Sequence, residues 1–159
     1  MENSYRHWAK QMCAMLNQDD DLRNNAEMRH GWGEQLRKIH DKILPKRSTD
    51  RTVSRKASKI LILNGKGNGY KKPKPKTIRY EHVVPLKDIV DRCLKLPRDA
   101  TIDQMIKLVT ALSCVSLITV EEANRLPSSV PPDWDGKDLY IRFKQVGLSE
   151  QLIFQNTRQ

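Results

Sequence analysis

The sequence predicts a mixed α+β fold, and three observations support this prediction. Apolar residues recur at helical spacing near the N-terminus, in residues 4–16 and 22–44. Short runs rich in β-branched residues follow, at 57–64, 77–84 and 114–118. Two Thr-x-x-Gln/Glu patterns, typical of capped helix starts, lie among these runs. The chain has 159 residues, so we expect residues 1–159 to form a single domain.

The N-terminal region, residues 1–56, is expected to be helical. The apolar stripe of residues 4–16 predicts a first helix with a polar cap. A looser stripe over residues 22–44 predicts a second helix, with Gly31 and Gly33 as candidate break points.

Two polar segments flank the second helical stretch. The aspartates at 19–21 could bind a metal, but at a helix start they are expected to interact with the positive end of the helix dipole. Residues 45–55 are basic and polar, which predicts a linker. The run at 57–64 then predicts the first strand.

A glycine-rich and then lysine-rich segment follows this strand. Residues 65–69 predict a turn, and the prolines and lysines of residues 70–76 predict an extended loop. A nucleotide-binding P-loop is not expected, because the Gly-Lys-Ser/Thr ending and a following capped helix are missing. The lysines of this segment are candidate phosphate contacts: Lys66, Lys71, Lys72, Lys74 and Lys76.

The middle of the chain alternates strands and helices. Residues 77–84 predict a strand that Pro85 ends, and residues 86–94 and 102–112 predict two helices. The run at 114–118 predicts a buried strand. The Thr-x-x-Glu pattern at residue 119 then predicts a helix that carries Asn124 and Arg125, which Pro127 ends early. In the C-terminal region, residues 132–159, a rigid turn precedes a helix around 139–146 and a frayed polar tail.

The strongly basic composition indicates a polyanionic partner. The formal net charge is +10, and lysine and arginine contacts to phosphate release condensed counterions, so DNA is the expected partner, with RNA as an alternative. The basic charge could instead serve solubility or attraction to anionic membranes. No apolar run approaches the roughly 20 residues that a membrane span needs, and Glu2, His7 and Lys10 make the N-terminus unlike a secretory signal. We therefore expect a cytoplasmic location and no membrane partner.

The cysteines and tryptophans are expected to be core residues. The three cysteines are widely spaced and lie in apolar patterns, which favours core thiols and excludes a Cys-x-x-Cys zinc site: Cys13, Cys93 and Cys114. The three tryptophans are expected to anchor the core, with stacking on nucleic-acid bases as the alternative: Trp8, Trp32 and Trp134.

Two segments carry a family resemblance. The run at 79–85 reads Arg-Tyr-Glu-His-Val-Val-Pro, and the run at 116–125 ends in Asn-Arg and precedes Ser-Val-Pro at 129–131. They resemble the opening strand and the closing strand and helix of the HNH, or ββα-metal, nuclease motif, and the closing part is similar to CRISPR effector HNH domains. The resemblance implies an N-terminal helical region packed on a ββα-metal finger at 57–131, with a helical insertion between its two strands.

The resemblance also implies a chemistry for these residues. His82 would be the general base, and Glu81 and Asn124 would be oxygen ligands of one Mg²⁺ or Mn²⁺ ion, with no structural zinc. Arg79 and Arg125 would join the lysines in binding phosphate. Neighbouring residues on a strand point to opposite faces, so Glu81 and His82 can share a site only if the strand twists, bulges or ends there. The implied function is a metal-dependent DNA endonuclease, in restriction, phage biology or a toxin.

Three departures from the family pattern leave alternatives open. Glu81 stands where aspartate is commoner, the connection between the strands is long, and the central asparagine of the motif is missing, so Ser113 or Ser116 would have to help position His82. His82 could instead be a structural residue beside Tyr80. The protein could then be a nucleic-acid-binding protein with a degenerate HNH fold, or a phage or plasmid inhibitor that docks an acidic partner. A homodimer and an inhibitor or immunity partner are further expectations that the sequence leaves open.

Overall fold

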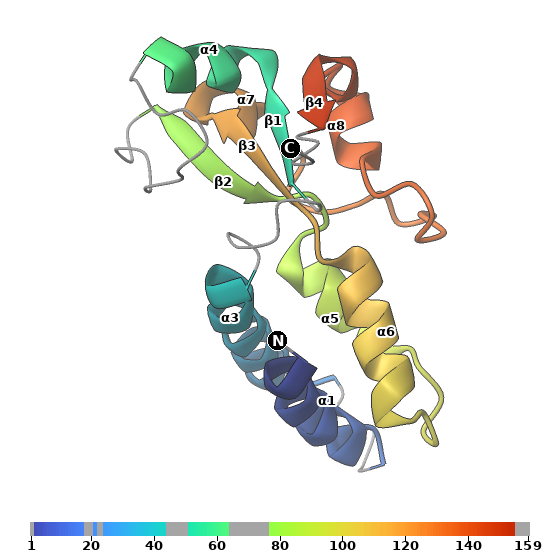
Figure 1. The fold of residues 1–159 in the computed structure, drawn as a ribbon. Coiled ribbons are helices and arrows are strands. Elements are labelled where there is room, and N and C mark those ends of the chain that lie inside the picture. The colour runs from blue at the N-terminus through green and yellow to red at the C-terminus, as the bar shows by residue number, and fades with distance from the viewer. Residues whose placement is uncertain (1, 18–20, 22–23, 44–50, 64–76, 155–159) are drawn as a thin grey trace. The chain divides into compact units, whose positions relative to one another are not determined.

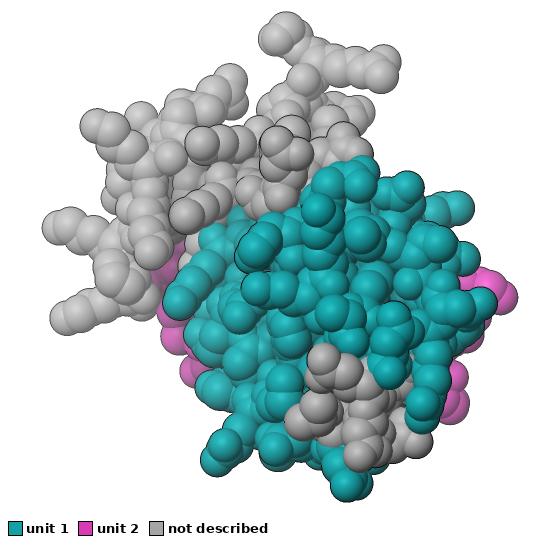
Figure 2. Space-filling view, turned by 90° about the horizontal axis from the view of Figure 1, so that it is seen from below, with its two compact units in different colours: residues 1–43, 85–113 teal, residues 44–84, 114–159 magenta. Residues whose placement is uncertain are grey.

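The computed structural model describes residues 2–17, 21, 24–43, 51–63 and 77–154, which form a mixed α+β structure (Figure 1). These residues belong to two compact units, each built from two stretches of chain and coloured separately in Figure 2. The helical unit comprises residues 1–43 and 85–113. The sheet unit comprises residues 44–84 and 114–159. The part of the chain that is described contains no helix long and apolar enough to cross a membrane.

The helical unit contains the helices expected from the apolar stripes. They are α1 (Glu2–Leu16), α3 (Ala26–Ile43), α5 (Leu86–Leu94) and α6 (Ile102–Leu112). Helix α1 packs on α6, and α3 packs on α5. The capping box that opens α6 is confirmed, since the Thr101 side chain accepts from the backbone N–H of Gln104 at 3.2 Å. The break expected at Gly31 and Gly33 is wrong, because α3 runs through both.

Aromatic residues lie at the centre of this unit. The Trp8 ring is only 1% exposed and meets the Trp32 ring edge to face at 6.3 Å between centroids. The Trp8 indole N–H donates to the Trp32 carbonyl at 3.3 Å. Burial of Trp8, and of Trp134 in the sheet unit, confirms them as core residues and leaves neither ring accessible for base stacking.

A buried polar pair joins α3 to the end of α6. The Ser113 hydroxyl donates to the Val109 carbonyl at 2.6 Å, so it accepts from the Nε2–H of His40 at 2.8 Å. His40 and Ser113 are both buried. Ser113 is therefore engaged within the helical unit.

Burial controls the chemistry of Cys93 in α5. Burial, and to a lesser degree the neighbouring Cys13, raises the pKa of the Cys93 thiol to about 12 from an ordinary 9.0. Because the folded-state pKa is the higher one, the stability from burying the neutral thiol is complete below about pH 9 and is lost as the pH rises toward 12.

We expect Cys93 to resist thiol reagents at pH 8 in the folded protein and to react at once in denaturant. The measurement is the rate of reaction with a chromogenic disulfide in a variant that keeps Cys93 and has alanine at the other two cysteines. A native rate equal to the denatured rate would contradict the buried placement.

The sheet unit is built on a four-stranded mixed sheet. Its strands are β1 (Arg51–Ser54), β2 (Ile78–His82), β3 (Val115–Thr119) and β4 (Leu152–Phe154), in the order β2-β3-β1-β4. Strand β2 pairs antiparallel with β3, β1 pairs parallel with β3, and β4 pairs antiparallel with β1. The strands expected at 77–84 and 114–118 are confirmed as β2 and β3. Strand β2 forms an edge of the sheet (Figure 1).

Two expectations for the rest of this unit are wrong. Strand β1 occupies part of the expected linker at 45–55, and β4 occupies part of the expected frayed tail. Both are short, and each is held by pairing with a strand distant in the sequence: β1 with β3, and β4 with β1. Residues 64–76, which include the expected turn and lysine loop, lie outside the described residues.

The strand expected at 57–64 is also wrong, because residues 55–63 form helix α4 (Arg55–Leu63). Its start is capped: the Ser54 hydroxyl accepts from the backbone N–H of Ala57 at 3.1 Å. Ala57 and Ile60, one turn apart, both face the sheet and pack with Val53 and Leu117. The β-prone run therefore serves as the buried side of a helix.

Helices cover both faces of the sheet. Helix α4 packs on one face. The other face carries α7 (Val120–Arg125) and α8 (Ile141–Gln145), followed by the short η3 (Ser149–Gln151). There the buried cluster consists of Val83, Ile118, Ala123, Phe143 and Leu148. Helix α8 is shorter than the helix expected at 139–146, and Gly147 follows it with a φ of 68°, a conformation that suits glycine.

The capping box that opens α7 is confirmed and extends into the core. Glu122 accepts from the backbone N–H of Thr119 at 2.8 Å, and the Thr119 hydroxyl accepts from that of Glu122 at 3.2 Å. The Ser54 hydroxyl donates to the same carboxylate at 2.7 Å, and Glu122 is only 1% exposed. Ser54 therefore links the starts of α4 and α7.

Replacement of Ser54 by alanine is expected to lower the free energy of unfolding of the sheet unit by about 2 kcal/mol, because a helix cap and a hydrogen bond to a buried carboxylate are both lost. Urea unfolding followed by circular dichroism measures this change. Ser58→Ala, on the same helix, is the matched control and should change stability by less than about 0.5 kcal/mol. Equal effects of the two substitutions would contradict the role of Ser54.

Candidate active site at the end of strand β2

The residues singled out by the sequence lie along a strand–strand–helix segment of the sheet unit. Strand β2 carries Glu81 and His82 at its C-terminal end, and the register places them opposite Ser116 and Val115 of β3. Helix α7 follows β3 directly and contacts both strands. The two strands are separated in the chain by α5 and α6, as expected for a helical insertion between them.

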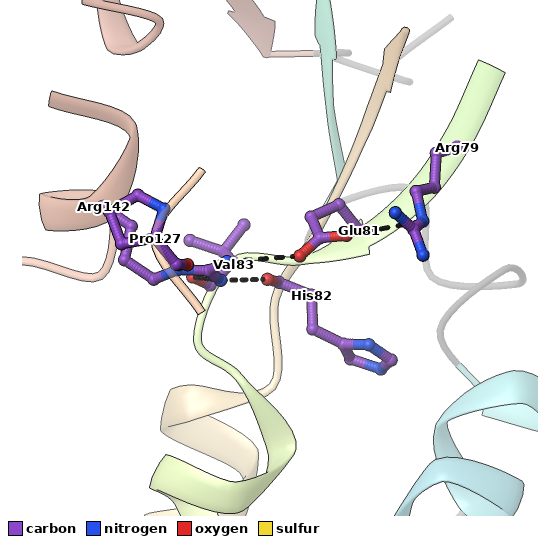
Figure 3. Close-up of polar contacts among 6 residues, drawn as sticks. All are labelled: Arg79, Glu81, His82, Val83, Pro127 and Arg142. Atoms are coloured by element: carbon purple, nitrogen blue, oxygen red, sulfur yellow. Dashed lines mark hydrogen bonds and ion pairs between the residues drawn. The ribbon is translucent and has the colours of Figure 1, made fainter. Parts of the chain in front are cut away.

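Glu81 lies between two arginines (Figure 3). Its Oε1 is 3.4 Å from Nη2 of Arg142, and its Oε2 is 4.0 Å from Nε of Arg79. The Glu81 side chain is 21% exposed and that of Arg79 is 57% exposed. One carboxylate oxygen thus accepts from a buried guanidinium, and the other lies near an exposed guanidinium at a distance too long for a hydrogen bond.

Arg142, on helix α8, donates hydrogen bonds to several groups at this end of the strand. Its side chain is 4% exposed. Nη1 donates to the carbonyls of His82 at 3.1 Å and Val83 at 3.3 Å, and Nε donates to the carbonyl of Pro127 at 2.6 Å. One guanidinium therefore joins the end of β2, the segment after α7, and α8.

His82 projects from the opposite face of β2. Figure 3 shows its imidazole pointing away from the Glu81 carboxylate. This follows from strand alternation, because Ile78 and Tyr80 face α4 and His82 continues that series. The His82 side chain is half-buried. The structure therefore brings Glu81 and His82 to the same strand end but does not place their side chains together.

The other predicted site residues lie on the surface or outside the described residues. Asn124 and Arg125 are exposed near the end of α7. Arg125 donates to the Val146 carbonyl at 2.6 Å. Within the described residues, no hydrogen bond joins Asn124 to Glu81 or His82. The five lysines lie outside the described residues: Lys66, Lys71, Lys72, Lys74 and Lys76.

Ser116 lies in a polar row on the same face of the sheet as Glu81. It stands between Glu81 and Thr52 in the register, and the Thr52 hydroxyl donates to its Oγ at 3.0 Å. The Tyr140 hydroxyl lies 3.5 Å from Thr52 Oγ1 and 3.2 Å from Sγ of Cys114. Ser116 and Ser113 are thus both engaged with other residues. The backbone at His82 is held by Arg142, which donates to the His82 carbonyl.

The two expected metal ligands lie in different surroundings: Glu81 lies between two arginines at the end of β2, and Asn124 is exposed near the end of α7. A carboxylate and a carboxamide oxygen are ligands that Mg²⁺ and Mn²⁺ accept, with water and phosphate completing the coordination. No cluster of three or more His, Cys, Asp or Glu side chains with the geometry of a metal site occurs among residues whose placement is described.

Arg142 was not predicted from the sequence as a site residue. It lies 61 residues after Glu81, so no local pattern joins them. One signal was present: Arg142 interrupts the run Tyr-Ile-Arg-Phe, in which both neighbours are apolar. A basic residue at a buried helical position requires acceptors nearby, and such residues are rarely fully buried without a partner.

Comparisons of the chain with protein-family models, with curated proteins and with solved structures found no match. The resemblance to the HNH motif therefore depends on the residues quoted above.

Proposed function

We propose that the protein is a metal-dependent DNA endonuclease of the HNH type. The observation that carries this proposal is the placement of Glu81, which a buried arginine holds at the end of the first strand of a strand–strand–helix segment. Glu81 shares a face of the sheet with α7, which carries Asn124. A strand–strand–helix order, with α5 and α6 inserted between the strands, supports the proposal.

In this proposal, His82 is the general base. A neutral imidazole can accept a proton from water near neutral pH. Strand β2 is an edge strand, and His82 lies on one face of the sheet and Glu81 on the other. In the structure the two side chains point to opposite faces of β2, so the proposal requires the strand end to bring both to one phosphate.

Glu81 and Asn124 would bind the divalent ion. When bound, Mg²⁺ or Mn²⁺ supplies charge stabilisation at the phosphate and the leaving oxygen. Arg79 is exposed beside Glu81 and would contact a phosphate oxygen, together with Arg125 and the lysines of 66–76. The net charge of +10 supports a polyanionic substrate.

The test is cleavage of end-labelled duplex DNA, single-stranded DNA and RNA, with Mg²⁺, with Mn²⁺ and with EDTA. The proposal expects metal-dependent cleavage of duplex DNA at phosphodiester bonds, with the bases left intact. Cleavage that continues in EDTA would contradict the metal requirement, and cleavage of RNA alone would change the substrate class.

A second candidate function is nucleic-acid binding without hydrolysis. The observation that favours it is the geometry of the site: His82 and Glu81 point to opposite faces, and Glu81 already has arginine partners. This candidate expects no cleavage in either metal, together with DNA binding that weakens steeply with salt. Substitution of Arg79 should then weaken binding without altering any reaction rate.

A further inference from the structure

The positive charge of this chain is concentrated in one stretch. Residues 51–80 contain 10 of its 29 lysines and arginines and no aspartate or glutamate. The other 19 basic residues are balanced by the 19 acidic residues of the chain, so the whole net charge of +10 belongs to this stretch. Charge that only served solubility would be spread among acidic residues, so its concentration here indicates a local binding surface.

Helix α4 presents three cations of this stretch at the surface of the sheet unit. Arg55, Lys56 and Lys59 are exposed, and at 3.6 residues per turn they lie within about 100° of one another around the helix axis. Ala57 and Ile60 turn the other way and pack against the sheet. We call the three exposed cations the α4 basic face.

The charges of the α4 basic face are largely unpaired within the protein. Lys56 is 54% exposed and lies 3.9 Å from the carboxylate of Glu121, which is 77% exposed, so water screens this contact. In the part of the chain that the structure describes, no carboxylate lies within ion-pair distance of Arg55 or Lys59. The face is therefore available to an anion from outside the chain.

These charges do not stabilise the helix that carries them. Arg55 and Lys56 belong to the first turn of α4, which has no acidic residue, and cations are unfavourable at the positive end of the helix dipole. Arg55 and Lys59 are four residues apart, so their like charges repel each other. An external anion would relieve both effects.

The chemistry of the face favours a chain of phosphates over a lipid surface. A helix that binds membranes carries large apolar side chains beside its cations. On α4, Ala57 and Ile60 are used in packing on the sheet, and among the described residues the one exposed large apolar side chain is Ile153 in β4. Guanidinium and ammonium groups on one helix face suit successive phosphates, which they bind with release of counterions.

We propose that the α4 basic face binds the phosphate backbone of a nucleic acid. This inference rests on the proposed function for the kind of partner, but it does not require hydrolysis. It adds a binding surface outside the candidate active site, formed by Arg55, Lys56 and Lys59. Because these side chains contact phosphates and not bases, binding is expected to be independent of base sequence.

The experiment removes two charges of the α4 basic face and compares the effect with a matched loss elsewhere. Arg55→Gln combined with Lys59→Gln is the test variant. Arg37→Gln combined with Lys38→Gln is the control, since it removes one exposed arginine and one exposed lysine from α3 in the helical unit. Binding of a short labelled DNA duplex, and of an RNA duplex of equal length, is measured by fluorescence anisotropy in EDTA over a range of salt concentrations.

The test variant should bind nucleic acid at least about 10-fold more weakly than the wild type at about 0.1 M salt. The slope of log Kd against log salt concentration should fall by about 2, because each lost phosphate contact lowers it by roughly 0.9. The control should bind as the wild type does. Arg55→Lys combined with Lys59→Arg keeps both charges and should also bind normally.

The stability of the test variant separates binding from a structural role. Its urea midpoint should be no lower than that of the wild type, because the two charges are unfavourable for α4. A lower midpoint would make these residues structural and would overturn the inference. Weakening seen with DNA alone or with RNA alone would identify which of the two supplies the phosphates.

Three further results would overturn the inference while the proposed function stands, provided that the wild type cleaves DNA. The first is a test variant that binds nucleic acid like the wild type. The second is equal weakening by the test and control variants, which would assign the effect to net charge. The third is a test variant that loses binding only to phosphatidylserine vesicles or to polyglutamate, because the partner would then be a membrane or an acidic protein.

The opposite separation is also possible. If the wild type binds nucleic acid through α4 but cleaves neither DNA nor RNA in Mg²⁺ or Mn²⁺, the proposed function fails and this inference stands. A wild type that binds neither duplex would overturn both.

Discussion

His82→Ala is expected to abolish DNA cleavage, with a loss of at least about 100-fold, which is the lower range for removal of a general base. The half-buried imidazole projects from the end of β2, and no other histidine of the sheet unit could replace it, since the remaining three lie in α1 and α3. The measurement is the rate of duplex cleavage at saturating Mg²⁺, at matched protein concentration.

The control for this substitution is His30→Ala, which removes an exposed histidine of α3. It should cleave at the wild-type rate. DNA binding by His82→Ala should also match the wild type, because the imidazole is proposed to act on water and not on phosphate. Cleavage by His82→Ala at the wild-type rate would show that His82 is only a structural neighbour of Tyr80.

Arg142→Met is expected to lower the free energy of unfolding of the sheet unit by about 3 kcal/mol, because removal of one partner leaves buried acceptors without a donor. Most of the loss should come from the three backbone carbonyls. The contact with Glu81 contributes less, since that side chain is 21% exposed and its ion pair is partly screened by water. Urea unfolding gives the change.

The matched control for Arg142→Met is Lys144→Met. Lys144 lies on the same helix as Arg142, and the substitution breaks its surface ion pair with Asp138, which has a length of 2.7 Å. Surface ion pairs contribute little, so this variant should stay within about 0.5 kcal/mol of the wild type. If both substitutions lowered the free energy of unfolding by the same amount, the buried hydrogen bonds of Arg142 would add nothing to stability.

Helices with local signals were predictable from the sequence. The capping boxes at Thr101 and Thr119 each lie within four consecutive residues, and both form as expected. The apolar stripes of α1, α5 and α6 likewise predict which side of each helix is buried. Each stripe can be recognised within its own helix. Strands β2 and β3 were also predicted, because they combine β-branched residues with clear ends.

The errors concern segments whose structure depends on distant partners. The run Ile-Leu-Ile-Leu at 60–63 has a strong strand preference, yet the Ser54 cap and the packing of Ala57 and Ile60 on the sheet give a helix. Strand β1 holds only four residues and β4 three. Their pairing, β1 with β3 and β4 with β1, has no local signal.

The candidate site was predictable only in part. Glu81, His82 and Asn124 could be chosen because they belong to short motifs. The opposite orientation of Glu81 and His82 follows from strand alternation, and the sequence could show only that a twist or strand end was needed to bring them together. Arg142 comes from a helix with no motif, and only the folded chain brings it to Glu81.

The central claim, metal-dependent hydrolysis at the end of β2, is tested most directly by nicking of a supercoiled plasmid. The wild type and His82→Ala are purified identically and incubated with Mg²⁺ or Mn²⁺, and with EDTA. The expected result is conversion of supercoiled to open-circular plasmid by the wild type with metal, and none by His82→Ala or in EDTA. A wild type that leaves the plasmid supercoiled in both metals while still binding it in a salt-sensitive way would contradict the nuclease assignment.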